Sequence, residues 1–172
     1  FRPMMVRSLA ADDFASDVIG RTCGVIVRKG KLLLFPLEPE RVLVIHPMLT
    51  GALQYCHFNV RISKKTFFSL CLPDAEMRYL DGKQMGLVYY VRPDQLNQVP
   101  RLAEQGPDVI TEYPDYETFV ARLKGFRGEI KGILTRGAFL SGIGNAYADE
   151  VLFAAGLSPF KKRNDMIEVE MS

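Results

Sequence analysis

The helical half of this chain is decided by one stretch, Gly142-Ile-Gly-Asn-Ala-Tyr-Ala-Asp-Glu-Val-Leu-Phe-Ala-Ala-Gly-Leu-Ser-Pro159. It predicts a helix over 145–155 that has Asn145 as its N-cap, because an Asn side chain accepts a hydrogen bond from a free first-turn amide. Gly156 is a good residue to follow the last helical turn, and a proline comes soon after it. The two glycines before the helix let the backbone turn sharply. The stretch therefore predicts a tight turn and a short capped helix.

A helix start of this kind can bind an anion, because its first amides are unpaired and face the positive end of the helix dipole. In isolation, however, the motif is usually just a tight turn and a cap. It is no dinucleotide fingerprint, since Tyr147 stands where the third glycine would be. Three basic clusters favour a phosphate-binding surface, and they lie at Arg122–Arg136, Arg28–Lys31 and Lys161–Arg163.

The composition is that of an ordinary globular chain. Of 172 residues, 48% are hydrophobic and 24% are charged, and no run approaches the roughly 20 apolar residues of a membrane-spanning helix. The net charge of +2 excludes a uniformly basic nucleic-acid binder. The three cysteines lack C-x-x-C spacing, and a metal site of Cys56, His57 and Cys71 is disfavoured because neighbouring strand residues face opposite sides. We expect reduced, mostly buried thiols in a cytoplasmic protein.

The first half of the sequence predicts strands and the second half predicts helices. Apolar or alternating runs between turn signals predict strands at 23–28, 31–35, 41–46, 57–62, 67–72, 76–80 and 86–91. Helical spacing predicts helices at 115–124, with Asp115 as its cap, 129–136 and 145–155. No helix is expected before the first predicted strand. The predicted fold class is α+β: an N-terminal antiparallel β-sandwich at 1–99, then a helical domain at 107–172, with a linker at 93–107.

Four separate motifs occur along the chain, and their order and spacing indicate a protein family. They are Arg28-Lys-Gly-Lys-Leu-Leu-Leu34, Ile45-His-Pro-Met-Leu-Thr-Gly-Ala-Leu53, Met77-Arg-Tyr-Leu-Asp-Gly-Lys-Gln-Met-Gly86 and Gly142-Ile-Gly-Asn-Ala-Tyr-Ala-Asp-Glu150. In this order and spacing the chain resembles the formamidopyrimidine-DNA glycosylase / endonuclease VIII family over about residues 20–159. The last motif is typical of the family's helix–two-turns–helix element, and Gly106-Pro107 and Ile130-Lys131 also fit it.

The resemblance implies a fold, an activity and a partner. The family joins a β-sandwich to a helical domain, usually followed by a four-cysteine zinc finger, and holds double-stranded DNA between its domains. Its members are base excision repair glycosylases with AP lyase activity. They remove oxidised bases and then cleave the abasic strand. The expected partner is therefore duplex DNA with a damaged base or an abasic site. The protein is expected to act as a monomer and not to bind a membrane.

The resemblance also assigns roles in phosphate binding. Asn145 and Gly144 would bind a backbone phosphate beside the lesion, and Lys131 and Arg127 would be further DNA contacts. Lys31 would reach the phosphates at the damaged nucleotide and assist catalysis. The alternative for Lys31 is a solvated turn lysine.

Three further residues would fill the gap that a flipped nucleotide leaves in the base stack. Met48 matches the family's first wedge residue, although plain core packing stays an alternative. Lys83 and Met85 stand where the family has an arginine and a phenylalanine. Methionine can still act as an apolar wedge, whereas lysine lacks the planar bidentate fork of arginine.

The catalytic amine of the family is missing from these residues. It belongs to an N-terminal proline followed by a glutamate, whereas this sequence begins Phe1-Arg2-Pro3-Met4. We expect a fragment of a longer cytoplasmic enzyme, nucleoid-associated if bacterial, whose proline and zinc finger lie outside it, so that no cofactor is expected within it. The alternative is an inactive DNA-binding module. An RNA-binding relative is disfavoured by the β domain with its Lys31 and Met48 turns.

Overall fold

The computed structural model describes residues 6–7, 11–167 and 170. The chain divides into two compact units, Phe1–Val99 and Pro100–Ser172. Pro3 lies outside the described residues. In the ranges that are described, no helix has both the length and the apolar character needed to cross a membrane.

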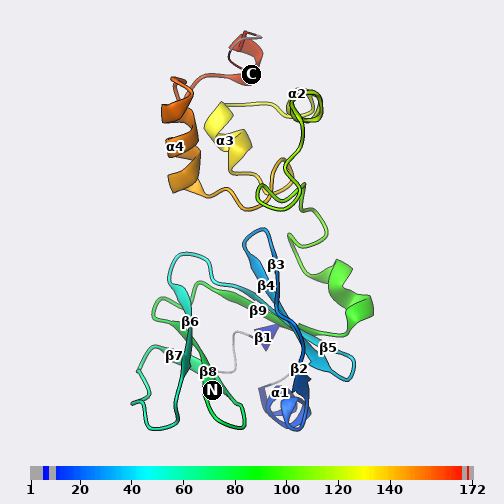
Figure 1. Cartoon of the computed structure of the whole chain (residues 1–172), viewed down its shortest axis with the longest axis vertical. Coiled ribbons are helices and arrows are strands. Elements are labelled where there is room, and N and C mark those ends of the chain that lie inside the picture. The colour runs from blue at the N-terminus through cyan, green and yellow to red at the C-terminus, as the bar shows by residue number, and fades with distance from the viewer. Residues whose placement is uncertain (1–5, 8–10, 168–169, 171–172) are drawn as a thin grey trace. The chain divides into compact units, whose positions relative to one another are not determined.

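Unit 1 is built on two β-sheets (Figure 1). The larger sheet has the order β1-β9-β5-β4-β2, with β3 also paired to β4, and the smaller has the order β6-β8-β7. All pairs are antiparallel except β1 with β9. The bounds are β1 Val6–Arg7, β2 Thr22–Cys23, β3 Val27–Lys29, β4 Leu32–Glu38, β5 Arg41–His46, β6 Gly51–Cys56, β7 Thr66–Cys71, β8 Glu76–Asp81 and β9 Leu87–Val91. A 3-10 helix, η1 (Pro93–Gln98), follows inside the predicted linker.

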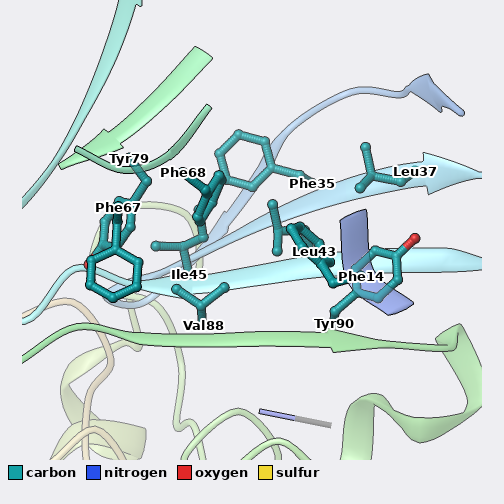
Figure 2. Close-up of a cluster of buried hydrophobic side chains, with 10 residues drawn as sticks. All are labelled: Phe14, Phe35, Leu37, Leu43, Ile45, Phe67, Phe68, Tyr79, Val88 and Tyr90. Carbon is teal, nitrogen blue, oxygen red and sulfur yellow. The ribbon is translucent and has the colours of Figure 1, made fainter. Parts of the chain in front are cut away.

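The core of unit 1 lies between the two sheets, as Figure 2 shows. Alternate residues of the larger sheet face inward, among them Leu43 and Ile45 on β5 and Val88 and Tyr90 on β9. This period of two is what a strand with one buried face requires. Opposite them the smaller sheet contributes Phe67, Phe68 and Tyr79. The predicted α+β fold class, with its β-sandwich, is confirmed.

A short helix that the sequence analysis did not predict completes this core. Helix α1 (Ala11–Val18) precedes β2, so the prediction of no helix before the first strand is wrong. Its Phe14 is buried and packs edge-to-face on Tyr90, with ring centroids 4.9 Å apart. Phe14 and Val18 lie one turn apart, which gives the helix an apolar face. Packing of that face, rather than the propensity of an Asp-rich segment, stabilises a helix this short.

Asp17 fixes α1 to the larger sheet. Its carboxylate accepts hydrogen bonds from Tyr90 Oη at 2.7 Å, from Arg41 Nε at 2.9 Å and from Arg21 Nη2 at 2.9 Å. These bonds, that from Tyr90 above all, lower the pKa of Asp17 from 3.8 to about 2, against a smaller opposing effect of burial. Burial together with the Asp17 carboxylate raises the pKa of Tyr90 to about 12.

The predicted strand at 57–62 is wrong. The segment is a loop, and the strand next to β8 is β6 (Gly51–Cys56). The alternation of Phe58, Val60 and Ile62 is misleading, because all three side chains are exposed. The fully buried Arg78 binds this loop instead, donating from Nη2 to the carbonyl of Val60 at 2.9 Å.

The predicted strands at 41–46, 67–72, 76–80 and 86–91 are confirmed within one residue, whereas β4 ends three residues beyond the predicted 31–35 and the first predicted strand is split. Residues 24–26 separate β2 from β3, although both pair with β4. The expectation of mostly buried thiols is wrong: all three cysteines are free, and Cys23 and Cys71 are exposed. Cys23 lies on the two-residue edge strand β2, and Cys71 is the last residue of the edge strand β7.

Unit 2 is helical and has its own core. It contains α2 (Tyr116–Lys124), α3 (Ile130–Leu134), α4 (Asn145–Ala154) and a 3-10 turn, η2 (Arg163–Asp165). Asp115 caps α2 as predicted, accepting from the amide of Thr118 at 2.8 Å. Helix α3 is shorter than the predicted 129–136. The core gathers around Phe139, whose ring lies 5.3 Å from those of Phe119 and Phe126.

The end of α4 agrees with its sequence signals. Gly156 adopts φ +65°, and its amide donates to the carbonyl of Phe153 at 3.1 Å. The amide of Leu157 donates to the carbonyl of Leu152 at 2.9 Å. These two bonds form a Schellman motif, which needs a left-handed residue at the position of Gly156.

We predict that Asp17→Asn lowers the free energy of unfolding by about 1–2 kcal/mol at neutral pH. The folded-state pKa of Asp17 is depressed, so its contribution is present above pH 3.8 and is lost as the pH falls toward 2. Urea denaturation followed by circular dichroism between neutral pH and pH 2 measures this. Asp13→Asn, an exposed change on the same helix, is the matched control. Equal stability of the two variants at neutral pH would contradict the prediction.

Candidate functional site

Three turns singled out by the sequence lie at one end of the larger sheet in unit 1. The pairing register aligns Leu33 of β4, Ile45 of β5 and Val88 of β9. The turn before β4, which carries Lys31, is therefore beside the end of β5 and the start of β9. The end of β5 leads into the turn 47–50, and the start of β9 follows the turn 82–86. Both of these turns connect the larger sheet to the smaller one.

Asp81 joins two of these turns through its carboxylate. Oδ1 accepts from Thr50 Oγ1 at 2.5 Å, and from the amides of Lys83 at 3.2 Å and Gln84 at 3.1 Å. Oδ2 accepts from the amide of Gly86 at 2.6 Å. Burial raises the pKa of Asp81, but these hydrogen bonds outweigh it and lower the pKa overall. The ionised carboxylate thus holds the turn 82–86 in shape and ties it to the turn 47–50.

Tyr79 fills the space beneath the same two turns. A Cβ on Gly86 would lie 1.8 Å from Tyr79 Oη, and one on Gly51 would lie 2.4 Å from it. Only glycine therefore fits at either position. The hydroxyl is buried and has no hydrogen-bond partner in the described part of the chain. Burial, and then the charge of Asp81, raise the pKa of Tyr79 to about 12, so the group stays neutral.

The predicted wedge residues lie at the surface of these turns. Met48 has φ 53° and is 36% exposed, and its amide donates to His46 Nδ1 at 3.1 Å. Met48 lies outside the core cluster, so the core-packing alternative does not hold. Met85 is 38% exposed, and Lys83 is exposed. Lys31 is also exposed, beside the buried Gly30. The roles assigned to these residues stay predictions.

In unit 2 the start of α4 differs from the expectation in one respect. Gly144 is the N-cap residue and Asn145 is the first helical residue, so the prediction of Asn145 as the cap is wrong. The glycine backbone, with φ −104° and ψ 178°, makes the entry into the helix, and no side chain caps it. The first helical bond runs from the amide of Ala148 to the carbonyl of Gly144, which leaves the three preceding amides outside that pattern. Asn145 is exposed, so its side chain is available to a ligand.

The turn before α4 is fixed by the segment around Gly106. The amide of Gly106 donates to the carbonyl of Gly137 at 2.8 Å, and the amide of Ser141 donates to the carbonyl of Pro107 at 2.9 Å. A Cβ on Gly106 would lie 2.6 Å from the carbonyl oxygen of Ala138. Glycine at position 106 is therefore needed for this close backbone approach. It positions the chain that leads through Gly142, at φ 102°, to the start of α4.

The predicted basic contacts of unit 2 lie around α3. Lys131 forms an ion pair with Asp149 of α4, with Nζ 2.7 Å from Oδ1. Arg127 is exposed in the loop before α3. The segment 161–163 runs beside this loop, because the amide of Ile130 donates to the carbonyl of Lys161 at 2.9 Å. Arg127 and the basic run at 161–163 thus lie on neighbouring segments, whereas Lys131 and Lys161 are each partly neutralised by an ion pair, that of Lys161 being with Glu170.

Sequence reasoning missed the residues that position the turns of unit 1. Asp81, Thr50 and Tyr79 stand within the quoted motifs, but the sequence predicts no role for any of them. An Asp whose side chain can accept from amides two and three residues later is the signal that could have identified Asp81. The described residues contain no group of three or more His, Cys, Asp or Glu side chains suited to a metal ion.

Comparison with known proteins identifies two family models along the chain. Residues 1–88 match the formamidopyrimidine-DNA glycosylase N-terminal domain, and residues 105–172 match the formamidopyrimidine-DNA glycosylase H2TH domain. A formamidopyrimidine-DNA glycosylase of Desulforamulus reducens is 30% identical over 100% of the chain and 63% of the relative. One of Thermus thermophilus is 32% identical over 88% of the chain and 55% of the relative. The chain thus spans less than two thirds of the length of these curated relatives.

Solved structures show the same likeness. The Lactococcus lactis enzyme in complex with DNA containing an abasic site has a TM-score of 0.88 at 26% identity, covering 98% of the chain and 62% of that protein. The same enzyme in complex with DNA containing FAPY-dG also has a TM-score of 0.88 at 26% identity, covering 98% and 63%.

We predict that Asp81→Ala destabilises unit 1 by about 2–4 kcal/mol, because the buried amide of Gly86 loses its acceptor. Hydrogen exchange should accelerate at the amides of Lys83, Gln84 and Gly86. Asp74→Ala, an exposed change in the β7–β8 turn, is the control.

A second variant tests the link between the turns. Thr50→Val should cost about 1 kcal/mol in the native background and almost nothing when combined with Asp81→Ala. Additive effects of the two changes would show that Thr50 and Asp81 do not act together.

Proposed function

This chain belongs to the formamidopyrimidine-DNA glycosylase family, and we propose that it recognises damaged duplex DNA within a base excision repair glycosylase. The complete activity removes an oxidised base and cleaves the resulting abasic strand. The observation that carries the proposal is the start of α4, where a glycine cap leaves three amides and the exposed Asn145 free for a ligand.

A DNA phosphate suits this helix start physically. Its oxygens accept hydrogen bonds from the unpaired amides, and the helix dipole favours a negative charge there. Asn145 can donate a further bond from its side-chain amide. Arg127, Lys162 and Arg163 supply positive charge in the same unit. The site is therefore suited to hold a backbone phosphate whatever the base sequence.

Unit 1 supplies the residues that replace a flipped nucleotide. Met48 and Met85 offer flexible apolar side chains on turns whose backbones are fixed by Thr50 and Asp81. An apolar side chain inserted between base steps offsets the few kcal/mol that unstacking costs. Lys83 would contact the unpaired base on the other strand as a point charge, without the fork of an arginine.

The chemical step needs an amine nucleophile, which the family provides as an N-terminal proline. The amine attacks the sugar carbon C1′ and the bond from C1′ to the base breaks; the C1′–O4′ bond of the sugar ring then breaks, with its electron pair going to O4′, to give the Schiff base. Lys31 would bind the phosphates of the damaged nucleotide and steady it during this attack. A zinc finger, a bacterial location near the nucleoid and a monomeric state are parts of the proposal that rest on the resemblance alone.

We predict that Asn145→Ala weakens binding to an abasic-site duplex by about 1–2 kcal/mol, independently of base sequence, because one charge-assisted hydrogen bond is lost. Fluorescence anisotropy with a tetrahydrofuran-containing duplex measures this. Asn97→Ala, an exposed change in η1, should leave the affinity unchanged. Equal affinities for all three proteins would contradict a phosphate site at α4.

Borohydride trapping distinguishes the enzyme from a binding module. The longest natural chain that contains these residues is incubated with an abasic duplex and borohydride, which reduces a Schiff base to a stable amine. The enzyme gives a covalent adduct that disappears when the terminal amine is blocked. Tight binding without any adduct would show an inactive DNA-binding module.

A further inference from the structure

A fourth turn reaches the end of unit 1 that carries Met48 and Met85. The smaller sheet has the order β6-β8-β7, and both outer strands run antiparallel to β8. Gly51 pairs with Asp81 and Thr66 pairs with Leu80, so the start of β7 lies at the same end as Asp81. The residues immediately before β7 are Ser63, Lys64 and Lys65. This segment, 63–65, is hereafter the lysine turn.

The backbone of the lysine turn is fixed at three points. The amide of Lys65 donates to Ser63 Oγ at 3.2 Å, and the amide of Thr66 donates to the carbonyl of Ser63 at 2.9 Å. The amide of Asp81 donates to the carbonyl of Lys65 at 2.9 Å. Asp81, whose carboxylate organises the turn 82–86, is therefore also bonded through its backbone to the lysine turn.

The side chain of Lys65 lies across Gly82. A Cβ on Gly82 would be 3.3 Å from Cδ of Lys65, 3.4 Å from Cγ and 3.5 Å from Cε. The aliphatic stem thus packs against the first residue of the turn that carries Lys83 and Met85. A lysine stem that lies on a neighbouring backbone keeps its ammonium group in solvent. The ammonium of Lys65 is in this way held close to the turn 82–86.

The positive charges at this place are not neutralised within the protein. No carboxylate among the described residues forms an ion pair with Lys64, Lys65 or Lys83, and all three side chains are exposed. The carboxylate of Asp81 is turned to Thr50 and to backbone amides. Like charges held together repel one another, and an anionic partner removes that cost.

We propose that the lysine turn is a DNA-phosphate contact of unit 1, with Lys65 as its main residue, acting on the duplex next to the base pairs that Lys83 and Met85 separate. The proposal rests on the proposed function, because it requires that this end of unit 1 faces DNA. A contact here would hold the backbone close to the wedge turn as the stack opens. It carries no base specificity, since it reads phosphates alone.

The salt dependence of DNA binding tests the proposal. Each phosphate contact contributes a slope of about −0.9 to the plot of log K against log salt concentration. Lys65→Gln should weaken binding to a tetrahydrofuran-containing duplex several-fold at about 50 mM salt and make the slope shallower by about 0.9. Lys65→Arg should keep both the affinity and the slope. An unchanged slope for Lys65→Gln would overturn the proposal.

Arg92→Gln is the matched control in unit 1. Arg92 follows the opposite end of β9, roughly 15 Å along the strand from the turn 82–86. The control removes one positive charge from an exposed side chain and should leave the slope unchanged. A slope that falls equally in Arg92→Gln and Lys65→Gln would reveal only a net-charge effect and would overturn the proposal.

Neutral methylphosphonate linkages locate the contact. Replacing phosphates one at a time on both strands beside the tetrahydrofuran site should reveal a position where the native protein loses affinity and Lys65→Gln does not. The absence of such a position would overturn the lysine contact even if the duplex is bound. If the native protein does not prefer the tetrahydrofuran duplex to an intact one, the proposed function fails instead, and the same comparison on intact duplex still tests Lys65.

Discussion

The carboxylate of Asp81 is the interaction on which the functional end of unit 1 depends. It lies where the chain leaves the smaller sheet, and its two oxygens satisfy one hydroxyl and three amides. A buried carboxylate is costly unless such donors surround it. Because the donors come from two turns, the cost of burial is offset only when both turns adopt this geometry. The arrangement therefore specifies the two turns together.

Tyr79 and the glycines beneath these turns impose the complementary constraint. The ring packs in the core between the sheets, while its hydroxyl occupies the space that side chains at Gly51 and Gly86 would need. The core of the sandwich thus determines how closely both turns approach the end of the sheet. Packing sets the position of the turns, and Asp81 sets their shape. The hydrophobic core and the hydrogen bonds of Asp81 thus both constrain the turns 47–50 and 82–86.

How much of this was predictable from sequence depends on the range of the interactions. The apolar runs of β5, β7 and β9 and the cap at Asp115 are local signals, and they predicted their elements well. Helix α1 was missed because its stability comes from Phe14 and Asp17 contacting β9 and β5, far away in sequence. The loop at 57–62 alternates like a strand, but β8 already has β6 and β7 on its two edges. The sequence motifs identified the exposed residues of the turns. The positioning roles of Asp81 and Tyr79 could be inferred only once the register of the sheets was known.

The two proposed DNA contacts, one in each unit, depend on opposite physical arrangements. At α4 the backbone itself would bind the phosphate, and the glycine cap keeps the amides and Asn145 unused by the fold. At the end of the sandwich the backbone amides are consumed by Asp81, and only flexible tips such as Met48, Lys65 and Met85 remain for a partner. A rigid backbone under flexible tips limits the entropy lost on binding to a few side-chain torsions. In the proposed function, phosphate binding at α4 would fix the register of the duplex, while the flexible side chains of unit 1 would adapt to the local opening of the stack.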